Sequence, residues 1–259
     1  MKHSYAVITG ASSGIGAAFA RCLAREGYPL VLVARRRERL EQLAQELKQA
    51  GVESVVFVAD LSQKEECYRL MEELSSKTLG VFINDAGFGD CGCFLETDVE
   101  KELEMIDVNV KAMHLLSKLV LRKMEKQNGG YLLNVVSSAG LIPAGPYMAT
   151  YYATKSYMLS LTRAVAQELK ERKSSVYIGA LCPGPVDTEF NSVANVEFAL
   201  HGITPEYCAE YAVRQMRKRR VLIVPTMTMK AATTFGRLIP QSLYIRLTGH
   251  QQKKKLGTK

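Results

Sequence analysis

The sequence predicts a doubly wound α/β fold, in which a parallel sheet of about seven strands carries helices on both faces. Short runs rich in β-branched residues alternate with longer stretches of helical periodicity. The short runs are apolar at nearly every position, as expected of strands covered on both faces. The stretches between them are long enough for the crossover helix that a parallel connection needs. The expected strands are residues 5–9, 30–33, 55–58, 81–84, 131–136, 176–181 and 221–224.

The length and composition fit one packed domain. The chain has 259 residues, of which 47% are hydrophobic and 23% charged, which is ordinary for a folded soluble protein. No apolar run is long enough for a membrane-spanning helix. The six cysteines show no paired framework, so we expect reduced thiols and a cytoplasmic protein. Because the histidines lack HExxH spacing, and Cys91 and Cys93 form CxC rather than CxxC, we expect no metal site.

A glycine-rich segment directly follows the first expected strand. Residues 9–16 read TGASSGIG and lead into an apolar-periodic helix expected at 17–25. Gly10 permits a tight turn, while Gly14 and Gly16 let the backbone approach a pyrophosphate, whose charge a helix N-terminus favours. The competing interpretation is an ordinary turn before a helix. The position between a strand and a helix favours dinucleotide binding, at the carboxyl ends of the strands.

Basic residues stand where the adenosine ribose of a dinucleotide would be recognised. The second strand runs into ARRR at residues 34–37, whereas an NAD-selective site would carry a carboxylate there for the ribose 2′-hydroxyl. Guanidinium groups bind phosphate in a bidentate manner, so Arg35, helped by Arg36 and Ser13, is expected to bind the 2′-phosphate of NADP(H). NAD(H) is the second choice. The alternative is a solvated basic start to a helix at 37–50, which the helix dipole disfavours.

Four polar residues could converge at the same edge of the sheet. Tyr151 and Lys155 are spaced by four and share one face of an expected helix. Ser138 ends the preceding strand, and Asn109 lies in the helix before that strand. Ser137 competes with Ser138, but adjacent strand residues point to opposite faces, so only one can serve, and we choose Ser138. A surface tyrosine, a strand-end serine and a helix-capping asparagine are each common, but beside a dinucleotide loop the set indicates catalysis.

These four residues suit the reduction of a carbonyl by hydride. The developing alkoxide needs a proton, and a phenol with its free pKa of about 10 is a sluggish donor near neutrality. The ammonium of Lys155, together with a positive oxidised nicotinamide, would lower the pKa of Tyr151. Ser138 would hydrogen-bond the substrate oxygen, and Asn109 would hold a water that links Lys155 to solvent.

The motifs resemble, in kind and order, those of the short-chain dehydrogenase/reductase family, and the likeness extends to about Pro225. The family's TGxxxGxG, NNAG, Asn, Ser, YxxxK and PGxxxT correspond to residues 9–16, 84–87, Asn109, Ser138, 151–155 and 183–188. One departure is Asp85 within NDAG, where the family usually has a second Asn. The segments around Phe88 and Tyr147 resemble a bacterial subgroup of uncharacterised reductases. The resemblance implies a Rossmann-type fold and a homodimer or homotetramer.

The resemblance also implies which residues contact the cofactor. The segment after the third strand would meet the adenine, the NDAG segment would flank the ribose, and the PGxxxT segment would surround the pyrophosphate and nicotinamide. The expected cofactor-binding residues are Gly10, Ser12, Ser13, Gly14, Ile15, Gly16, Arg35, Arg36, Asp60, Leu61, Asn84, Ala86, Gly87, Tyr151, Lys155, Pro183, Gly184, Val186 and Thr188. The expected catalytic residues are Asn109, Ser138, Tyr151 and Lys155.

A segment at residues 187–205 is expected to form a lid over the substrate, because it joins the last cofactor-binding strand to the next helix. Its apolar side chains indicate an apolar substrate, such as a ketoacyl chain or a steroid-like ketone. They are Phe190, Val193, Val196, Phe198 and Leu200. We therefore expect an NADP(H)-dependent oxidoreductase that interconverts a carbonyl and an alcohol. The alternative is a non-catalytic NADP(H)-binding sensor or scaffold, which would not need Lys155 next to Tyr151.

The C-terminal end differs in charge from the rest of the chain. Residues 211–259 contain 12 Lys or Arg and no Asp or Glu. We expect residues 1–225 to form the dinucleotide-binding and catalytic part, and residues 226–259 to form a basic amphipathic extension of the same domain. The favoured interpretation is that the extension packs on the domain or across a dimer, and the alternative is peripheral contact with an anionic membrane. Aromatic residues are too sparse among the charges to indicate nucleic-acid binding.

Overall fold

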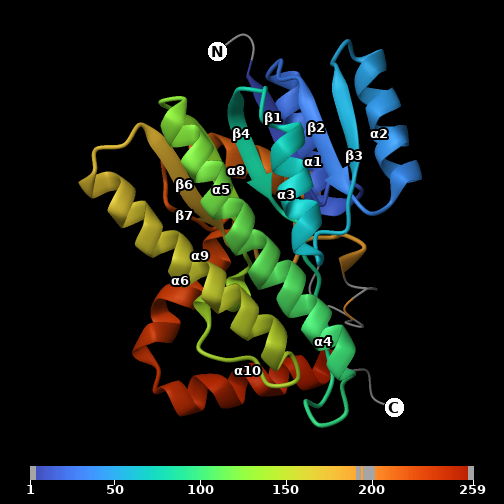
Figure 1. The fold of residues 1–259 in the computed structure, drawn as a ribbon. Coiled ribbons are helices and arrows are strands. Elements are labelled where there is room, and N and C mark those ends of the chain that lie inside the picture. The colour runs from blue at the N-terminus through green and yellow to red at the C-terminus, as the bar shows by residue number, and fades with distance from the viewer. Residues whose placement is uncertain (1–3, 191–193, 195–201, 256–259) are drawn as a thin grey trace.

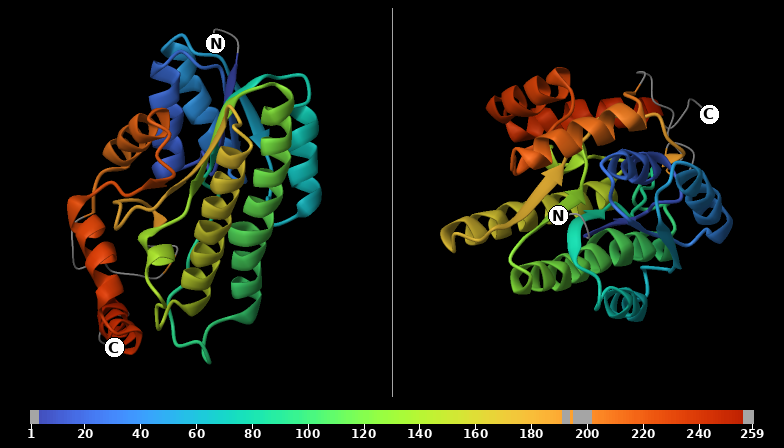
Figure 2. Two further views of the ribbon diagram at one scale, coloured as in Figure 1. Left: turned by 90° about the vertical axis from the view of Figure 1, so that its left-hand side faces the viewer. Right: turned by 90° about the horizontal axis from the view of Figure 1, so that it is seen from above.

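The computed structural model describes residues 4–190, 194 and 202–255, which form a seven-stranded sheet between two layers of helices (Figures 1 and 2). The strand order is β3-β2-β1-β4-β5-β6-β7, and every neighbouring pair is parallel. The strands are β1 (Tyr5–Thr9), β2 (Leu30–Ala34), β3 (Ser54–Val58), β4 (Leu79–Asn84), β5 (Gly130–Val135), β6 (Val176–Leu181) and β7 (Leu222–Ile223). The order reverses between β1 and β4, so the prediction of a doubly wound α/β fold is confirmed.

Helices cover both faces of the sheet, as Figure 2 shows. One face packs against α1 (Gly14–Arg25), α2 (Arg37–Gln49) and α8 (Pro205–Arg217), and the other against α3 (Lys64–Glu73), α5 (Met113–Lys126) and α6 (Ala149–Glu171). Successive strand residues point to opposite faces, so Ile8 joins the first layer of the core and Val7 the second. This is why the strands are apolar at nearly every position.

A buried polar network ties the central strands to the second helical layer. Asn84, the last residue of β4, donates from Nδ2 to Asn134 Oδ1 in β5 at 3.1 Å and to the carbonyl of Met113 in α5 at 3.0 Å. Asn134 donates in turn to Thr162 Oγ1 in α6 at 2.9 Å. Because these buried N–H groups find partners on other elements, the network fixes α5 and α6 relative to the strand ends.

The remaining elements surround the carboxyl edge of the sheet. They are α4 (Val99–Ile106), the π-helical turn η1 (Asp107–Ala112), the 3₁₀ turns η2 (Ser138–Leu141) and η3 (Gly236–Leu238), α9 (Met227–Phe235) and α10 (Gln241–Lys255). α10 lies across the end of α6 (Figure 1), where Gln252 Nε2 donates to Tyr152 Oη at 2.5 Å. Leu243 and Leu247 on α10 remain exposed. No helix in the described part of the chain is long and apolar enough to cross a membrane.

Candidate active site

β1 leads into α1 through a turn that depends on glycine. Gly10 and Gly14 have φ angles of 70° and 53°, in the left-handed region that L side chains rarely adopt. A Cβ on Gly16 would overlap the carbonyl oxygen of Gly10 and would lie 2.8 Å from Asp85 Oδ2. Ser13 precedes α1 without a side-chain cap, so the helix N-terminus can bind an anion. The turn therefore fits a pyrophosphate group.

Arg36 hydrogen-bonds the two serine hydroxyl groups of this turn. Its guanidinium donates to Ser12 Oγ at 3.1 Å and to Ser13 Oγ at 2.7 Å. The same guanidinium forms an ion pair with Glu189 at 2.8 Å. One cation and two hydroxyls thus stand beside the pyrophosphate cradle, which is the donor set that a further phosphate group would need.

Arg35 contacts a different element, the helix α4. Its guanidinium forms an ion pair with Glu104 of α4 at 2.7 Å. The prediction gave Arg35 the leading part in binding a 2′-phosphate, with Arg36 and Ser13 assisting. In the structure Arg36 contacts Ser12 and Ser13, and the contact of Arg35 is with Glu104, so the order of the two arginines stays a prediction.

The NDAG loop after β4 is held against the glycine-rich turn. Thr9 Oγ1 accepts hydrogen bonds from the backbone N–H groups of Asp85 at 2.9 Å and Ala86 at 3.0 Å. The carboxyl group of Asp85 accepts from the backbone N–H of Gly16. Burial raises the pKa of Asp85 to about 7, against the opposing attraction of Lys155. A titratable group therefore stands between the glycine-rich turn and Lys155.

Asn109 lies in the π-helical turn η1 between α4 and α5, and its side chain is fully buried. Its Oδ1 accepts from the backbone N–H of Phe88 at 3.1 Å, and its Nδ2 donates to the carbonyl of Phe88 at 2.8 Å and to Thr154 Oγ1 at 3.2 Å. Thr154 donates to the carbonyl of Tyr151 at 2.8 Å. The amide of Asn109 thus links the NDAG loop to α6. These contacts hold the side chain in place between the loop and the helix, and the predicted role of Asn109 in holding a water stays a prediction.

Tyr151 and Lys155 lie on the first turns of α6, and only 8% and 4% of their surfaces are exposed. Lys155 Nζ donates to the carbonyl of Val135 at 3.2 Å and lies 5.7 Å from the ring centroid of Tyr151. Burial raises the pKa of Tyr151, against a hydrogen bond with Ser137. Burial lowers the pKa of Lys155 to about 8, against the attraction of Asp85. The phenol therefore carries its proton at neutral pH.

The serine that hydrogen-bonds Tyr151 is Ser137, whereas the sequence predicted Ser138. The hydroxyl of Ser137 hydrogen-bonds Tyr151 and also accepts from the backbone N–H of Ala139 at 3.1 Å. Ser138 instead begins the turn η2, where its backbone N–H donates to the carbonyl of Pro183 at 2.8 Å. The choice between the two serines depended on where β5 ends, at Val135, and on the turn that follows.

The PGxxxT segment after β6 forms one wall of the site. A Cβ on Gly184 would lie 2.8 Å from Met229 Cγ, so this segment packs directly on α9. Val186 is buried and pairs with Ile203 in an isolated parallel bridge. Thr188 packs against the glycine-rich turn. The last described residue of the segment, Phe190, contacts the phenol ring of Tyr151, with ring centroids 5.5 Å apart. Of the predicted lid residues, Val193, Val196, Phe198 and Leu200 lie outside the described residues.

Several predicted cofactor contacts have side chains that are engaged elsewhere. Leu61 is buried in the core beneath α3, and Ile15 packs against the opposite layer of the core. Asp60 Oδ1 accepts from the backbone N–H of Ser62 at 3.1 Å. The amide of Asn84 belongs to the buried network between β4 and β5.

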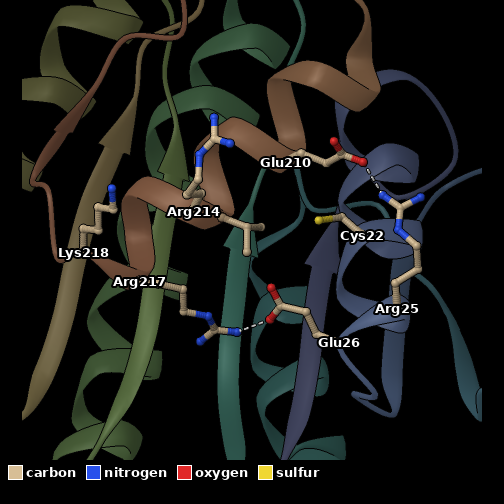
Figure 3. Close-up of a pocket in the computed structure, with 8 residues that line it drawn as sticks. Cys22, Arg25, Glu26, Glu210, Arg214, Arg217 and Lys218 are labelled. Carbon is tan, nitrogen blue, oxygen red and sulfur yellow. Dashed lines mark hydrogen bonds and ion pairs between the residues drawn. The ribbon is translucent and has the colours of Figure 1, made fainter.

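A separate surface groove lies at the other end of α1 (Figure 3) and has a volume of about 560 Å³. Ion pairs between Arg25 and Glu210 and between Arg217 and Glu26 cross it. The groove contains none of the predicted site residues. In the part of the chain that the structure describes, no group of three or more His, Cys, Asp or Glu could hold a metal ion.

Comparison with known proteins agrees with this arrangement. Residues 4–197 match the family model described as short chain dehydrogenase. The very-long-chain 3-oxoacyl-CoA reductase of Anas platyrhynchos is 32% identical over 201 residues, a match that covers 75% of this chain and 64% of that protein. An uncharacterized oxidoreductase of Staphylococcus saprophyticus is 32% identical over 235 residues, which covers 89% of this chain and 98% of that protein.

The fold has close structural counterparts. A short-chain dehydrogenase from Sphingobium yanoikuyae, solved in complex with NADPH, superposes with a TM-score of 0.82 and 29% identity, covering 93% of this chain and 94% of that one. The family match extends over most of the sheet and the site described above. The chain therefore belongs to the short-chain dehydrogenase/reductase family of oxidoreductases.

Proposed function

We propose that the protein uses NADP(H) to interconvert a carbonyl and an alcohol. The observation that carries this proposal is the hydrogen bond between the hydroxyls of Tyr151 and Ser137, with Lys155 Nζ 5.7 Å from the tyrosine ring. When a substrate oxygen replaces their mutual hydrogen bond, the two hydroxyl groups can both donate to that oxygen as it gains negative charge. Their place at the carboxyl edge of the sheet, where ligands bind in this architecture, supports the assignment.

The side chains supply the proton and the hydrogen bonds that reduction needs. A bound NADPH supplies the hydride to the carbonyl carbon. The carbonyl oxygen takes the phenolic proton of Tyr151 and becomes the hydroxyl of the alcohol, while Ser137 donates to the same oxygen. The ammonium of Lys155 offsets the negative charge that this transfer leaves on Tyr151. In the direction of oxidation, the phenolate takes the proton back.

The choice of NADP(H) over NAD(H) rests on the cation at the end of β2. Arg36, Ser12 and Ser13 present three side-chain donors beside the glycine-rich turn. A 2′-phosphate would accept hydrogen bonds from these donors through its charged oxygens, whereas the 2′-hydroxyl of NAD(H) offers the guanidinium only a neutral oxygen. Dissociation constants for NADPH and NADH test this choice. We expect NADPH to bind more tightly, and equal affinities would contradict it.

An apolar substrate fits the surroundings of the catalytic tyrosine. Tyr151 belongs to a buried cluster with Ala139 and Met148, and partly buried apolar side chains line it. These are Phe88, Ile142, Tyr147 and Phe190. Such walls favour a ketone on an apolar chain or ring, such as a ketoacyl or steroid-like substrate. A panel of ketones of increasing chain length, followed by NADPH absorbance, measures the preference, and a preference for small polar ketones would contradict it.

Replacement of the catalytic phenol tests the proposal against the alternative of a non-catalytic NADP(H)-binding sensor or scaffold. Tyr151→Phe removes the proton donor, and we expect kcat to fall by about 10²–10⁴-fold while the dissociation constant for NADPH is unchanged. Tyr152→Phe is the matched control, because Tyr152 is an equally buried neighbour whose hydroxyl contacts Gln252. If the wild type reduces a carbonyl and Tyr151→Phe reduces it at the same rate, the assignment of Tyr151 as the proton donor is contradicted. No turnover of any carbonyl or alcohol by the wild type would favour the sensor.

A cytoplasmic homodimer or homotetramer is the proposed assembly, following the family resemblance. The exposed apolar residues of the C-terminal elements are available for such contacts or for peripheral binding to a membrane. They are Phe235, Leu238, Leu243 and Leu247. Light scattering gives the oligomer mass, and a monomer would contradict the assembly. Flotation with anionic liposomes at low and high salt separates the two uses of this surface, because binding to anionic lipid weakens as salt rises.

A further inference from the structure

A short segment after β6 contacts the proposed cofactor site at three points. Thr188 packs against the glycine-rich turn. Glu189 pairs with Arg36 at 2.8 Å. Phe190 packs on the ring of Tyr151, with centroids 5.5 Å apart. Three consecutive side chains thus cover the pyrophosphate cradle, the cationic cluster and the catalytic phenol.

The contact of Glu189 places a carboxylate on Arg36, the cation that we propose binds the 2′-phosphate of NADP. We infer that the carboxylate of Glu189 occupies the place of the 2′-phosphate on Arg36, so that Glu189 sets the preference between NADP and NAD. The inference rests on the proposed function, because it assumes that Arg36 binds the 2′-phosphate.

The chemistry of the cluster supports competition. The Arg36 guanidinium directs Nη1 to Glu189 and Nη2 to Ser12 and Ser13. Arg39 adds a second guanidinium, 3.5 Å from the same carboxylate. Hydrogen bonds from Arg36 lower the pKa of Glu189, so its carboxylate is ionised at neutral pH. A phosphate needs the same donors and is repelled by the carboxylate, so it binds only when the ion pair opens.

The adenosine ribose of NAD(H) carries a 2′-hydroxyl in place of the 2′-phosphate, so Glu189 does not repel it. Its 2′-hydroxyl is a hydrogen-bond donor, and a carboxylate is the usual acceptor for this group in dinucleotide sites. Glu189 therefore weakens NADP binding and does not oppose NAD binding. Contacts of Thr188 with the glycine-rich turn and of Phe190 with Tyr151 should affect both cofactors alike, because the turn and the phenol lie beside parts that NADP and NAD share.

Removal of the negative charge of Glu189 tests its effect on cofactor affinity. Glu189 and Arg36 are 43% and 47% exposed, so their ion pair has the modest strength of a surface contact. We expect Glu189→Gln to tighten NADP⁺ binding about two- to fivefold and to leave NAD⁺ binding unchanged or slightly weaker. The matched control is Glu46→Gln, which removes the same charge from an exposed ion pair with Arg21 that lies outside the site.

Calorimetric titration of the full chain with NADP⁺ and with NAD⁺ gives the dissociation constants without turnover. The inference predicts that the NADP⁺ to NAD⁺ affinity ratio rises in Glu189→Gln and stays constant in Glu46→Gln. When Arg36 is already replaced by Gln, Glu189→Gln should lose its effect on the affinity ratio. The cation for which the carboxylate and the phosphate compete is then gone. An unchanged ratio in Glu189→Gln, or an equal gain without Arg36, would overturn the inference.

The same titrations separate this inference from the proposed function. One outcome is that the wild type prefers NADP⁺, that Arg36→Gln removes this preference and that Glu189→Gln leaves it unchanged. In that case only the role of Glu189 is wrong. If the wild type binds neither dinucleotide, the proposed function and the inference are both wrong. If Arg36→Gln leaves the wild-type preference intact, the phosphate site lies elsewhere and the inference is overturned with it.

Discussion

The reassignment of the catalytic serine gives the sharpest prediction about turnover. Ser137 hydrogen-bonds Tyr151 in a site where only 8% of the tyrosine surface is exposed, so water cannot readily replace its hydroxyl. Removing one donor to a developing oxyanion in such a site lowers kcat by about 10²–10³-fold, or roughly 2.7–4 kcal/mol. We expect this loss for Ser137→Ala. For Ser138→Ala we expect little loss, because its backbone bond to Pro183 survives the change.

The assay is steady-state reduction of an apolar ketone, with NADPH absorbance as the readout. Ser137→Ala also loses the side-chain bond from the Ala139 N–H, which costs about 1 kcal/mol of stability, so thermal unfolding must show that both variants are folded at the assay temperature. The dissociation constant for NADPH should be the same in both variants. A large loss of kcat in Ser138→Ala, with Ser137→Ala near wild type, would refute the reassignment and restore the choice made from sequence.

Two further predictions follow from the buried contacts around the cofactor turn. Asp85→Asn removes the carboxylate that raises the pKa of Lys155, so this pKa should fall below about 8. In the proposed mechanism the protonated lysine is the active form, so the loss of kcat/KM at alkaline pH should begin at lower pH, and a pH profile with an unmoved or raised alkaline limb would show that Asp85 does not act on Lys155. Gly16→Ala places a methyl group into the carbonyl of Gly10 and near Asp85 Oδ2, so the free energy of unfolding in urea should fall by about 1–3 kcal/mol; an unchanged value would mean that the turn can relax.

The sheet could be predicted from sequence because its strands are buried on both faces. Their apolar runs end where the chain leaves the core, and the observed bounds of β1 and β6 equal the predicted ones. β7 is shorter than predicted, since only Leu222 and Ile223 pair with β6 at the edge of the sheet. A continuous run of apolar residues does not reveal how far an edge strand stays paired.

The site was predictable where a motif carries the chemistry. Tyr151 and Lys155 were chosen from helical spacing together with Asn109, Ser138 and the dinucleotide loop, and the glycine-rich turn was recognised from its position after β1. Ser137 rather than Ser138 hydrogen-bonds Tyr151 because β5 ends at Val135, so the two serines lie in the turn after the strand, where the alternation of a strand no longer decides which one faces the site. Glu189 gave no local signal, because it pairs with Arg36 across 153 residues of chain. Contacts of this kind depend on tertiary packing.

The central claim is that the hydroxyls of Tyr151 and Ser137 stand where a carbonyl oxygen is reduced. A crystal structure of the protein with NADP⁺ and an unreactive apolar ketone analogue tests it most directly. We predict that both hydroxyl oxygens contact the analogue's oxygen, and that this oxygen lies on the same side of the nicotinamide ring as Tyr151. An analogue bound with its oxygen turned away from Tyr151, or a nicotinamide ring remote from it, would contradict the account.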